Sequence, residues 1–188
     1  MFLEVLTEDE KALIVSLPYR AGLWVSLADE KGKGAAWACE MKTIEKVIAR
    51  LSEGMFASAF VHEVLAETHA RRAQWPSWAL QVGTVPEEAR QAVNILIDKA
   101  LPPDAEAYVQ TIMSIGYETA YAFREYDRSA SIPIRIWVWL RLLWEKFIRT
   151  GNKDYRVESV TNISLAEDQA IALLAEALTL TPMTRDVS

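Results

Sequence analysis

Apolar residues recur along most of the chain at steps of three and four residues, which is the spacing of amphipathic helices. The pattern is clearest in residues 35–51 and in residues 164–178. The apolar stripes of these two segments are Ile44, Val47, Ile48 and Leu51, and Ile171, Leu174, Ala175 and Leu178. The pattern predicts an all-α fold, a single helical-bundle domain of about seven to eight helices.

Short polar signals mark where these helices begin and end. Three pairs have the spacing of a capping box, in which a hydroxyl and a carboxylate satisfy free backbone N–H groups: Thr7 with Glu10, Thr84 with Glu87, and Ser164 with Glu167. Further helices are expected over residues 57–72, 84–101 and 104–126, with a connector at 75–83. Pro18 is expected to interrupt or kink the first helix, because proline lacks an N–H and crowds the preceding turn.

The segment 134–142 fits two readings. Its strict alternation of apolar and polar residues is that of a strand. Arg141, Glu145 and Arg149, in contrast, follow one another at helical spacing, and the chain offers no partner strand. We therefore predict a helix here.

The two halves of the chain resemble each other. Gly22 corresponds to Gly116, and the small residues that follow each glycine also correspond. Downstream, Glu40 and its apolar stripe match Glu167 and the later stripe with identical spacing. The first half spans about residues 7–80 and the second about 84–180, with an insertion at 128–162 and a frayed tail at 181–188. Since neither half can bury its stripe alone, the halves should pack together, unless helices of similar composition align here by chance.

Two short segments resemble a known family. They are Val25-Ser26-Leu27-Ala28-Asp29-Glu30, which a Gly-bearing loop joins to Glu40 and the helix after it, and Asn162-Ile163-Ser164-Leu165-Ala166-Glu167. Both are similar to the TerB-like (tellurite-resistance TerB) helical domain. The resemblance covers about half of the chain and implies an all-α fold and an association with stress response.

The resemblance also implies a divalent cation, Ca²⁺ or Mg²⁺, at the acidic positions Asp29, Glu30 and Glu40. Hard oxygen ligands suit these ions when several converge on one point. Two departures weaken the match: Glu30 stands where the family has Gly, and Phe123 aligns with Asp29 in the second half. The alternative is that these carboxylates are solvated or cap a helix.

Composition and charge exclude several classes of protein. The chain has 188 residues, 51% of them apolar, which excludes disorder as its main state. The net charge of −6 opposes nucleic-acid binding, because a duplex binder needs a positive stripe. The single cysteine, Cys39, cannot form an intrachain disulfide, and the acidic start is unlike a secretory signal. We therefore expect a cytoplasmic protein.

No set of residues with catalytic spacing is present. His62 and His69 are seven residues apart, whereas zinc sites on one helix place histidines three or four residues apart. Phosphate loops, dinucleotide fingerprints and nucleophile elbows do not occur. We therefore expect a protein without enzymatic activity, although a carboxylate-dependent metalloenzyme would escape this search.

The insertion concentrates aromatic and basic side chains in an otherwise acidic chain. The residues that would contact a partner or a membrane are Arg135, Trp137, Trp139, Arg141, Trp144, Phe147 and Arg149. On a helix the basic and aromatic residues gather on opposite faces, which is typical of a membrane-surface helix, of a docking helix and of a core helix with a solvated face. We predict a helical module that docks another protein, with a peripheral membrane protein that uses residues 132–149 as the alternative.

Overall fold

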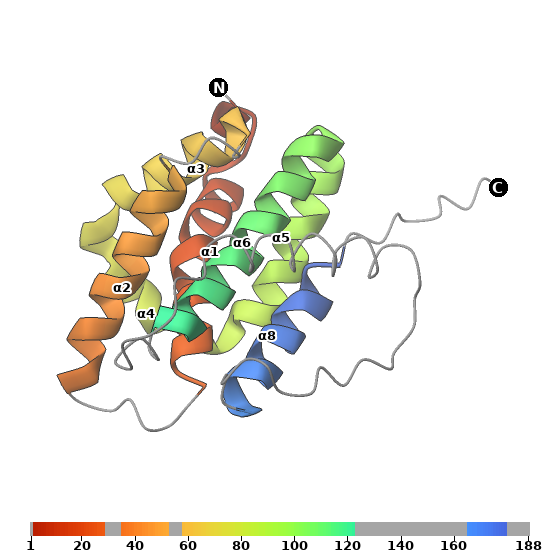
Figure 1. Cartoon of the computed structure of the whole chain (residues 1–188). Helices are drawn as coiled ribbons and strands as arrows, with labels where there is room; N and C mark the ends of the chain where they lie inside the picture. The colour runs from red at the N-terminus through yellow and green to blue at the C-terminus, as the bar shows by residue number, and fades with distance from the viewer. Residues whose placement is uncertain (1, 29–34, 53–57, 123–164, 180–188) are drawn as a thin grey trace. The chain divides into compact units, whose positions relative to one another are not determined.

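The computed structural model describes residues 2–28, 35–52, 58–122 and 165–179 of the chain (Figure 1). These residues form seven α-helices, three 3-10 helices and no strand, which confirms the all-α prediction. The chain divides into two compact units, Met1–Phe123 with Ile163–Ser188, and Arg124–Asn162. All described residues belong to the first unit. The predicted insertion at 128–162 and the helix predicted over 134–142 lie outside them.

From α3 to α6 the helices follow one another with short connections. The α-helices are α1 (Glu8–Ser26), α2 (Ala35–Ser52), α3 (Ala59–Ala70), α4 (Trp75–Ala79), α5 (Val85–Lys99), α6 (Pro102–Ala122) and α8 (Leu165–Ala177), and the 3-10 helices are η1 (Phe2–Glu4), η3 (Arg72–Gln74) and η4 (Val82–Thr84). The helix predicted over residues 104–126 was expected to start after Pro102 and Pro103. This start is wrong, because α6 begins at Pro102 itself. A first turn tolerates proline, since its N–H groups have no partner within the helix.

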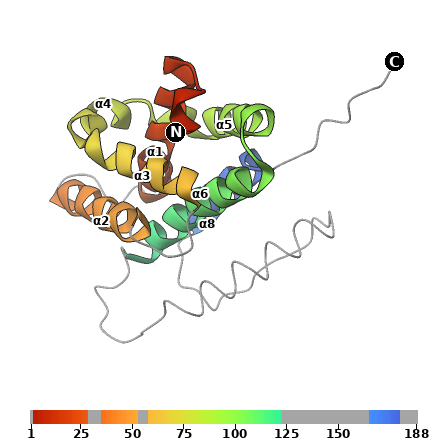
Figure 2. The ribbon, with the colours of Figure 1, turned by 90° about the horizontal axis from the view of Figure 1, so that it is seen from above.

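Helix α1 lies at the centre of the described helices and contacts α2, α3, α4, α5, α6 and α8 (Figures 1 and 2). From Ile14 to Ser26 every residue except Trp24 is buried. A helix that is surrounded on all sides must be apolar on nearly all sides. This requirement makes the few polar residues in α1, above all Arg20, informative about the fold.

The first predicted capping box is confirmed. The Glu10 backbone N–H donates to Thr7 Oγ1 at 3.3 Å, and the Thr7 N–H donates to Glu10 Oε2 at 2.8 Å. Lys99 Nζ, at the end of α5, also donates to Glu10 Oε2 at 2.6 Å. The hydrogen bond from Lys99, followed by the one from the Thr7 backbone, lowers the pKa of Glu10. The cap therefore also joins α1 to α5.

The second predicted capping box is wrong. Thr84 makes no side-chain cap at the start of α5. Its backbone has φ −98° and ψ 5°, because η4 runs directly into α5, whereas a capping hydroxyl needs an extended residue before the helix. The Thr84 hydroxyl contacts Arg20 and Glu88 instead. The third predicted capping box, Ser164 with Glu167, stays a prediction, because Ser164 lies outside the described residues.

Of the two outcomes predicted for Pro18, interruption does not occur, since one helix runs through it from Glu8 to Ser26. The proline leaves the carbonyl of Ile14, four residues earlier, without its usual backbone donor. Tyr108 on α6 supplies the missing bond: its hydroxyl donates to Ile14 O at 2.9 Å. Burial raises the pKa of Tyr108 well above its ordinary value, so the donor keeps its proton. A neighbouring helix thus satisfies the defect that the proline creates.

This arrangement predicts that the effects of two substitutions depend on each other. Tyr108→Phe leaves the buried Ile14 carbonyl unsatisfied and should lower the free energy of unfolding by about 1.5 kcal/mol. In a Pro18→Ala background the N–H at position 18 can serve that carbonyl, so the same change should cost much less. Urea unfolding of the four proteins measures the coupling. Equal costs in the two backgrounds would contradict this account of Pro18.

The two glycines that correspond in the repeat lie where α1 and α6 approach each other. A Cβ added to Gly22 would lie 3.2 Å from Thr119 Oγ1 on α6, and one added to Gly116 would lie 3.4 Å from Val25 Cγ2 on α1. Val25 and Thr119 are themselves corresponding residues, each three positions after its glycine. The contact is therefore reciprocal: Gly22 faces Thr119, which corresponds to Val25, and Gly116 faces Val25, which corresponds to Thr119.

The second helix of each half follows the same scheme. Both α2 and α8 contact α1, and both contact α6. Gly22 faces Ile44 of α2, and Gly116 faces Leu174 of α8. Leu174 lies one turn beyond Ile171, the residue that corresponds to Ile44, so the match is approximate. The packing is the mutual burial expected of two similar helix pairs.

Candidate functional site

A groove of about 390 Å³ lies between α1 and α5, with α4 and the residues after it at one end. Helix α1 contributes Asp9, Glu10, Ala12, Leu13, Ser16 and Arg20, α5 contributes Glu88, Gln91 and Ile95, and the segment between α3 and α5 contributes Trp78 and Gln81. The α1 residues recur at steps of three and four, so they form one flank of that helix. The groove lies where this flank of α1 faces one flank of α5.

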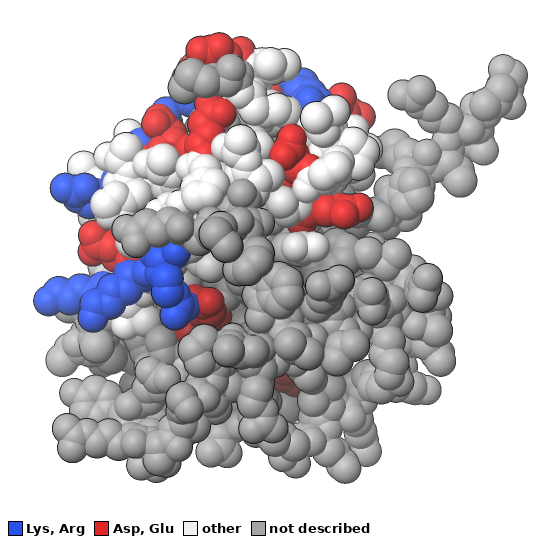
Figure 3. Space-filling model, turned by 45° about the horizontal axis from the view of Figure 1, so that its top comes forward, with Lys and Arg blue, Asp and Glu red and all other residues white. Residues whose placement is uncertain are grey.

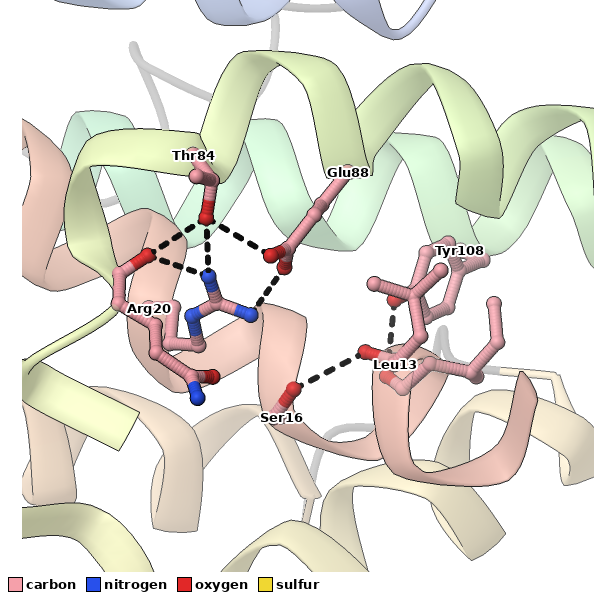
Figure 4. Close-up of polar contacts among 8 residues, drawn as sticks. Leu13, Ser16, Arg20, Thr84, Glu88 and Tyr108 are labelled. Carbon is pink, nitrogen blue, oxygen red and sulfur yellow. Dashed lines mark hydrogen bonds and ion pairs between the residues drawn. The ribbon is translucent and has the colours of Figure 1, made fainter. Parts of the chain in front are cut away.

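Arg20 closes one end of the groove (Figure 4). Its side chain is 3% exposed, and its Nη1 forms an ion pair with Glu88 Oε2. Its Nη2 donates to the Gln81 carbonyl and, at 3.0 Å, to Thr84 Oγ1. Three contacts therefore tie one buried guanidinium to the start of α5 and to the turn before it. Arg20 Nε is buried without a hydrogen-bond partner.

Glu10 and Lys99 close the other end, at an N–O distance of 2.6 Å. Since Arg20 pairs with Glu88 and Glu10 pairs with Lys99, α1 and α5 are antiparallel. Ten positions of α1 separate the two ion pairs, which is roughly 15 Å at 1.5 Å per residue. The groove is therefore about three helical turns long.

Between its ends the groove is mainly apolar. Leu13, Trp78 and Ile95 line it, and each is half-buried rather than fully covered. Ala12 and Ser16 stand one turn apart on α1, so small side chains form part of its wall. The Ser16 hydroxyl donates to the Leu13 carbonyl at 3.2 Å (Figure 4). The proton of this hydroxyl is therefore already used in a hydrogen bond within α1.

A stack of aromatic rings holds Trp78 in place. Tyr19 stacks on the buried Trp75 with ring centroids 4.4 Å apart, and the Trp78 ring lies 6.3 Å from Tyr19. Trp75 Nε1 donates to the Thr68 carbonyl at 3.1 Å, which fixes the stack to α3. Burial raises the pKa of Tyr19 to about 12, so its hydroxyl stays protonated at neutral pH. The aromatic rings therefore connect Trp78, in the groove wall, to α1 and α3.

Three of the four charged residues that line the groove join helices, and Asp9 is the exception. Arg20, Glu10 and Glu88 are each committed to an ion pair. A general acid, general base or nucleophile needs a polarised partner and room for a substrate beside it. These paired charges hold α1 to α5.

The residues predicted for cation binding and for contact with a partner or membrane lie outside what the structure describes. Asp29 and Glu30 fall between α1 and α2, and the side chain of Glu40 is likewise not described. The aromatic and basic residues from Arg135 to Arg149 belong to the second unit. These predictions therefore stay predictions.

The two histidines lie on α3, as the sequence suggests. His69 Nε2 is 3.7 Å from Glu45 Oε1 on α2, and both side chains are more than one-third exposed. His62 is half-buried. Among the described residues, no group of three His, Cys, Asp or Glu side chains could hold a metal ion.

The groove has one local signal in the sequence, and this signal does not locate it. Arg20 is the one charged residue in the apolar stretch 12–28, so a signal was present: a lone arginine in such a stretch needs a buried acceptor. Its partners Gln81, Thr84 and Glu88 lie more than 60 residues away and carry no matching signal.

The face shown in Figure 3 carries both signs of charge, with most of its Lys and Arg side chains at one side and the Asp and Glu side chains spread more widely. No family model matches the chain, and neither the curated proteins nor the solved structures contain a match. No described helix combines the length and apolar content needed to cross a membrane.

Proposed function

We propose that the chain is a helical interaction module that docks another protein and catalyses no reaction of its own. The groove between α1 and α5 is the observation that carries this proposal. It is hollow, it exposes parts of Leu13, Trp78 and Ile95, and the ion pairs at its ends fix its width. Partly exposed apolar side chains on a rigid support are typical of protein contact sites.

The size of the native assembly tests this function. The chain alone has a mass of 21.2 kDa. We expect it to elute from a native cell extract, at moderate salt, as part of a larger complex with a second protein. Elution at the mass of the isolated chain would contradict the proposal. Sedimentation with anionic vesicles would instead favour a peripheral membrane protein that uses residues 132–149.

We infer further that the chain consists of two TerB-like halves with an association with stress response. The inference rests on the short motifs around Asp29 and Glu167 and on the glycines that correspond in the two halves. The reciprocal contacts of Gly22 with Thr119 and of Gly116 with Val25 support a duplication. The cytoplasmic location is proposed on the strength of the single cysteine.

The cation proposed at Asp29, Glu30 and Glu40 makes a separate prediction. A ligand that prefers the folded state must raise the melting temperature. Thermal unfolding with Ca²⁺, Mg²⁺, Mn²⁺ or Zn²⁺ should therefore show a rise for at least one ion, and Asp29→Asn should remove it. Glu106→Gln on α6 is the control, since Glu106 is exposed and distant in sequence from the three carboxylates. An unchanged melting temperature with every ion, or a rise that survives Asp29→Asn, would discard the site.

A further inference from the structure

We propose that the groove between α1 and α5 receives an amphipathic helix of the partner protein that presents apolar residues to the floor and Lys or Arg to one rim. This inference deepens the proposed function and rests on it. It adds the class of segment that docks and the place where it does so.

The shape of the groove favours a helix. Its two walls are antiparallel helices, and a third helix packs naturally into the seam between two others. Its length of about three turns is enough for an apolar stripe of three or four side chains. The small side chains of Ala12 and Ser16 allow a close approach along α1.

The charge at one end of the groove indicates which charge the docking segment should carry there. Asp9 lines the groove, and Asp98 is three positions after the lining residue Ile95, which puts it on the same flank of α5 near the end of the groove where Glu10 pairs with Lys99. Both residues are exposed, and neither side chain has a hydrogen bond or ion pair with another described residue. The two cations of the groove region, Arg20 and Lys99, are already paired. Carboxylates are therefore in excess at this rim, which attracts a cationic segment.

The first experiment uses two synthetic helices of about 14 residues, roughly four turns each. One carries Leu on one face and Lys on the other, and its counterpart has Glu in place of every Lys. We expect the full chain to bind the Lys peptide in fluorescence anisotropy and not the Glu peptide. Absence of binding to the Lys peptide, or equal binding of both, overturns the inference. The native-complex experiment decides the proposed function independently.

Matched substitutions locate the binding. Ile95 lines the groove, whereas Ile97 on the same helix is 40% exposed and does not line it. Ile95→Asn should weaken binding of the Lys peptide about tenfold or more, and Ile97→Asn less than about twofold. Both variants carry the same change in the same helix. Equal weakening, or none, places the peptide elsewhere and overturns the inference.

Pairs of substitutions that each remove two negative charges distinguish attraction by the rim carboxylates from attraction by the overall negative charge of the chain. Asp9→Asn with Asp98→Asn should weaken binding about fivefold, because two unpaired rim carboxylates are removed. Glu106→Gln with Glu176→Gln removes the same charge from exposed positions outside the groove and should change binding less than about twofold. All four positions are exposed, so these variants should fold even where Ile95→Asn does not. Equal weakening by the two pairs overturns the assignment of the rim.

Discussion

Replacing Arg20 by Met should lower the free energy of unfolding by about 3 kcal/mol. The substitution keeps most of the aliphatic volume but removes the guanidinium from Glu88 and from the Gln81 carbonyl, so that the single hydroxyl of Thr84 is their remaining side-chain donor. Removing one member of a buried pair costs more than the pair itself contributes, because the remaining charge has lost both water and partner. Glu88 keeps 21% of its side-chain exposure, so the cost should fall at the lower end of the range for buried pairs.

Adding Glu88→Leu to Arg20→Met distinguishes this explanation from a loss of packing. With the carboxylate gone no charge is stranded, so the double variant should be more stable than Arg20→Met alone. Chemical denaturation of the two variants and the unmodified chain gives the comparison. A stability of Arg20→Met within about 0.5 kcal/mol of the unmodified chain would show that Arg20 does not hold α1 to α5.

Gly22→Leu should be comparably destabilising, by about 3 kcal/mol. Even a single added Cβ would lie 3.1 Å from Ile115 Cγ2, 3.2 Å from Ile44 Cγ2 and 3.2 Å from Thr119 Oγ1. Neighbours on α2 and α6 therefore close around the glycine, and a larger side chain must push these helices apart. The requirement is for space, since a residue within a regular helix needs no unusual backbone angle.

Gly116→Ala is the comparison at the corresponding glycine, where an added Cβ has more room. Its Cβ would meet Val25 Cγ2 at 3.4 Å and Leu174 Cδ2 at 3.6 Å, which are ordinary contact distances. Alanine also favours a helix over glycine by about 1 kcal/mol. We expect Gly116→Ala to be neutral or slightly stabilising in thermal unfolding. Equal destabilisation by the two substitutions would mean that α1 and α6 do not cross at Gly22 as described.

The helix pattern of the fold could be predicted from local sequence, because apolar spacing and the Thr7 cap act over a few residues. The reciprocal glycines could also be identified by comparing the two halves. Local reasoning was wrong where a distant helix determines the result. Pro18 was expected to disturb α1, and the hydroxyl of Tyr108, ninety positions later, makes the uninterrupted helix tolerable.

The candidate site was less accessible to prediction for the same reason. Thr84 and Glu87 have the spacing of a capping box, yet Thr84 does not cap α5. The 3-10 helix that ends at Thr84 places its hydroxyl beside Arg20, whose guanidinium donates to it. The groove depends on which flank of α1 faces α5, and both helices have polar flanks of ordinary composition. Apolar spacing predicts that a helix is buried on one side, but it does not name the neighbour.

We expect the two helix pairs, α1 with α2 and α6 with α8, to be stable only by burying each other. Native-state hydrogen exchange can detect this dependence, because it measures the opening free energy of each helix separately. We predict that the buried amides of α1 from Ile14 to Leu23 and those of α6 from Ile112 to Ala120 share one opening free energy, equal to that of global unfolding. Exchange of the α1 amides or of the α6 amides at a clearly lower free energy, while the other set stays protected, would show that the two pairs do not depend on each other.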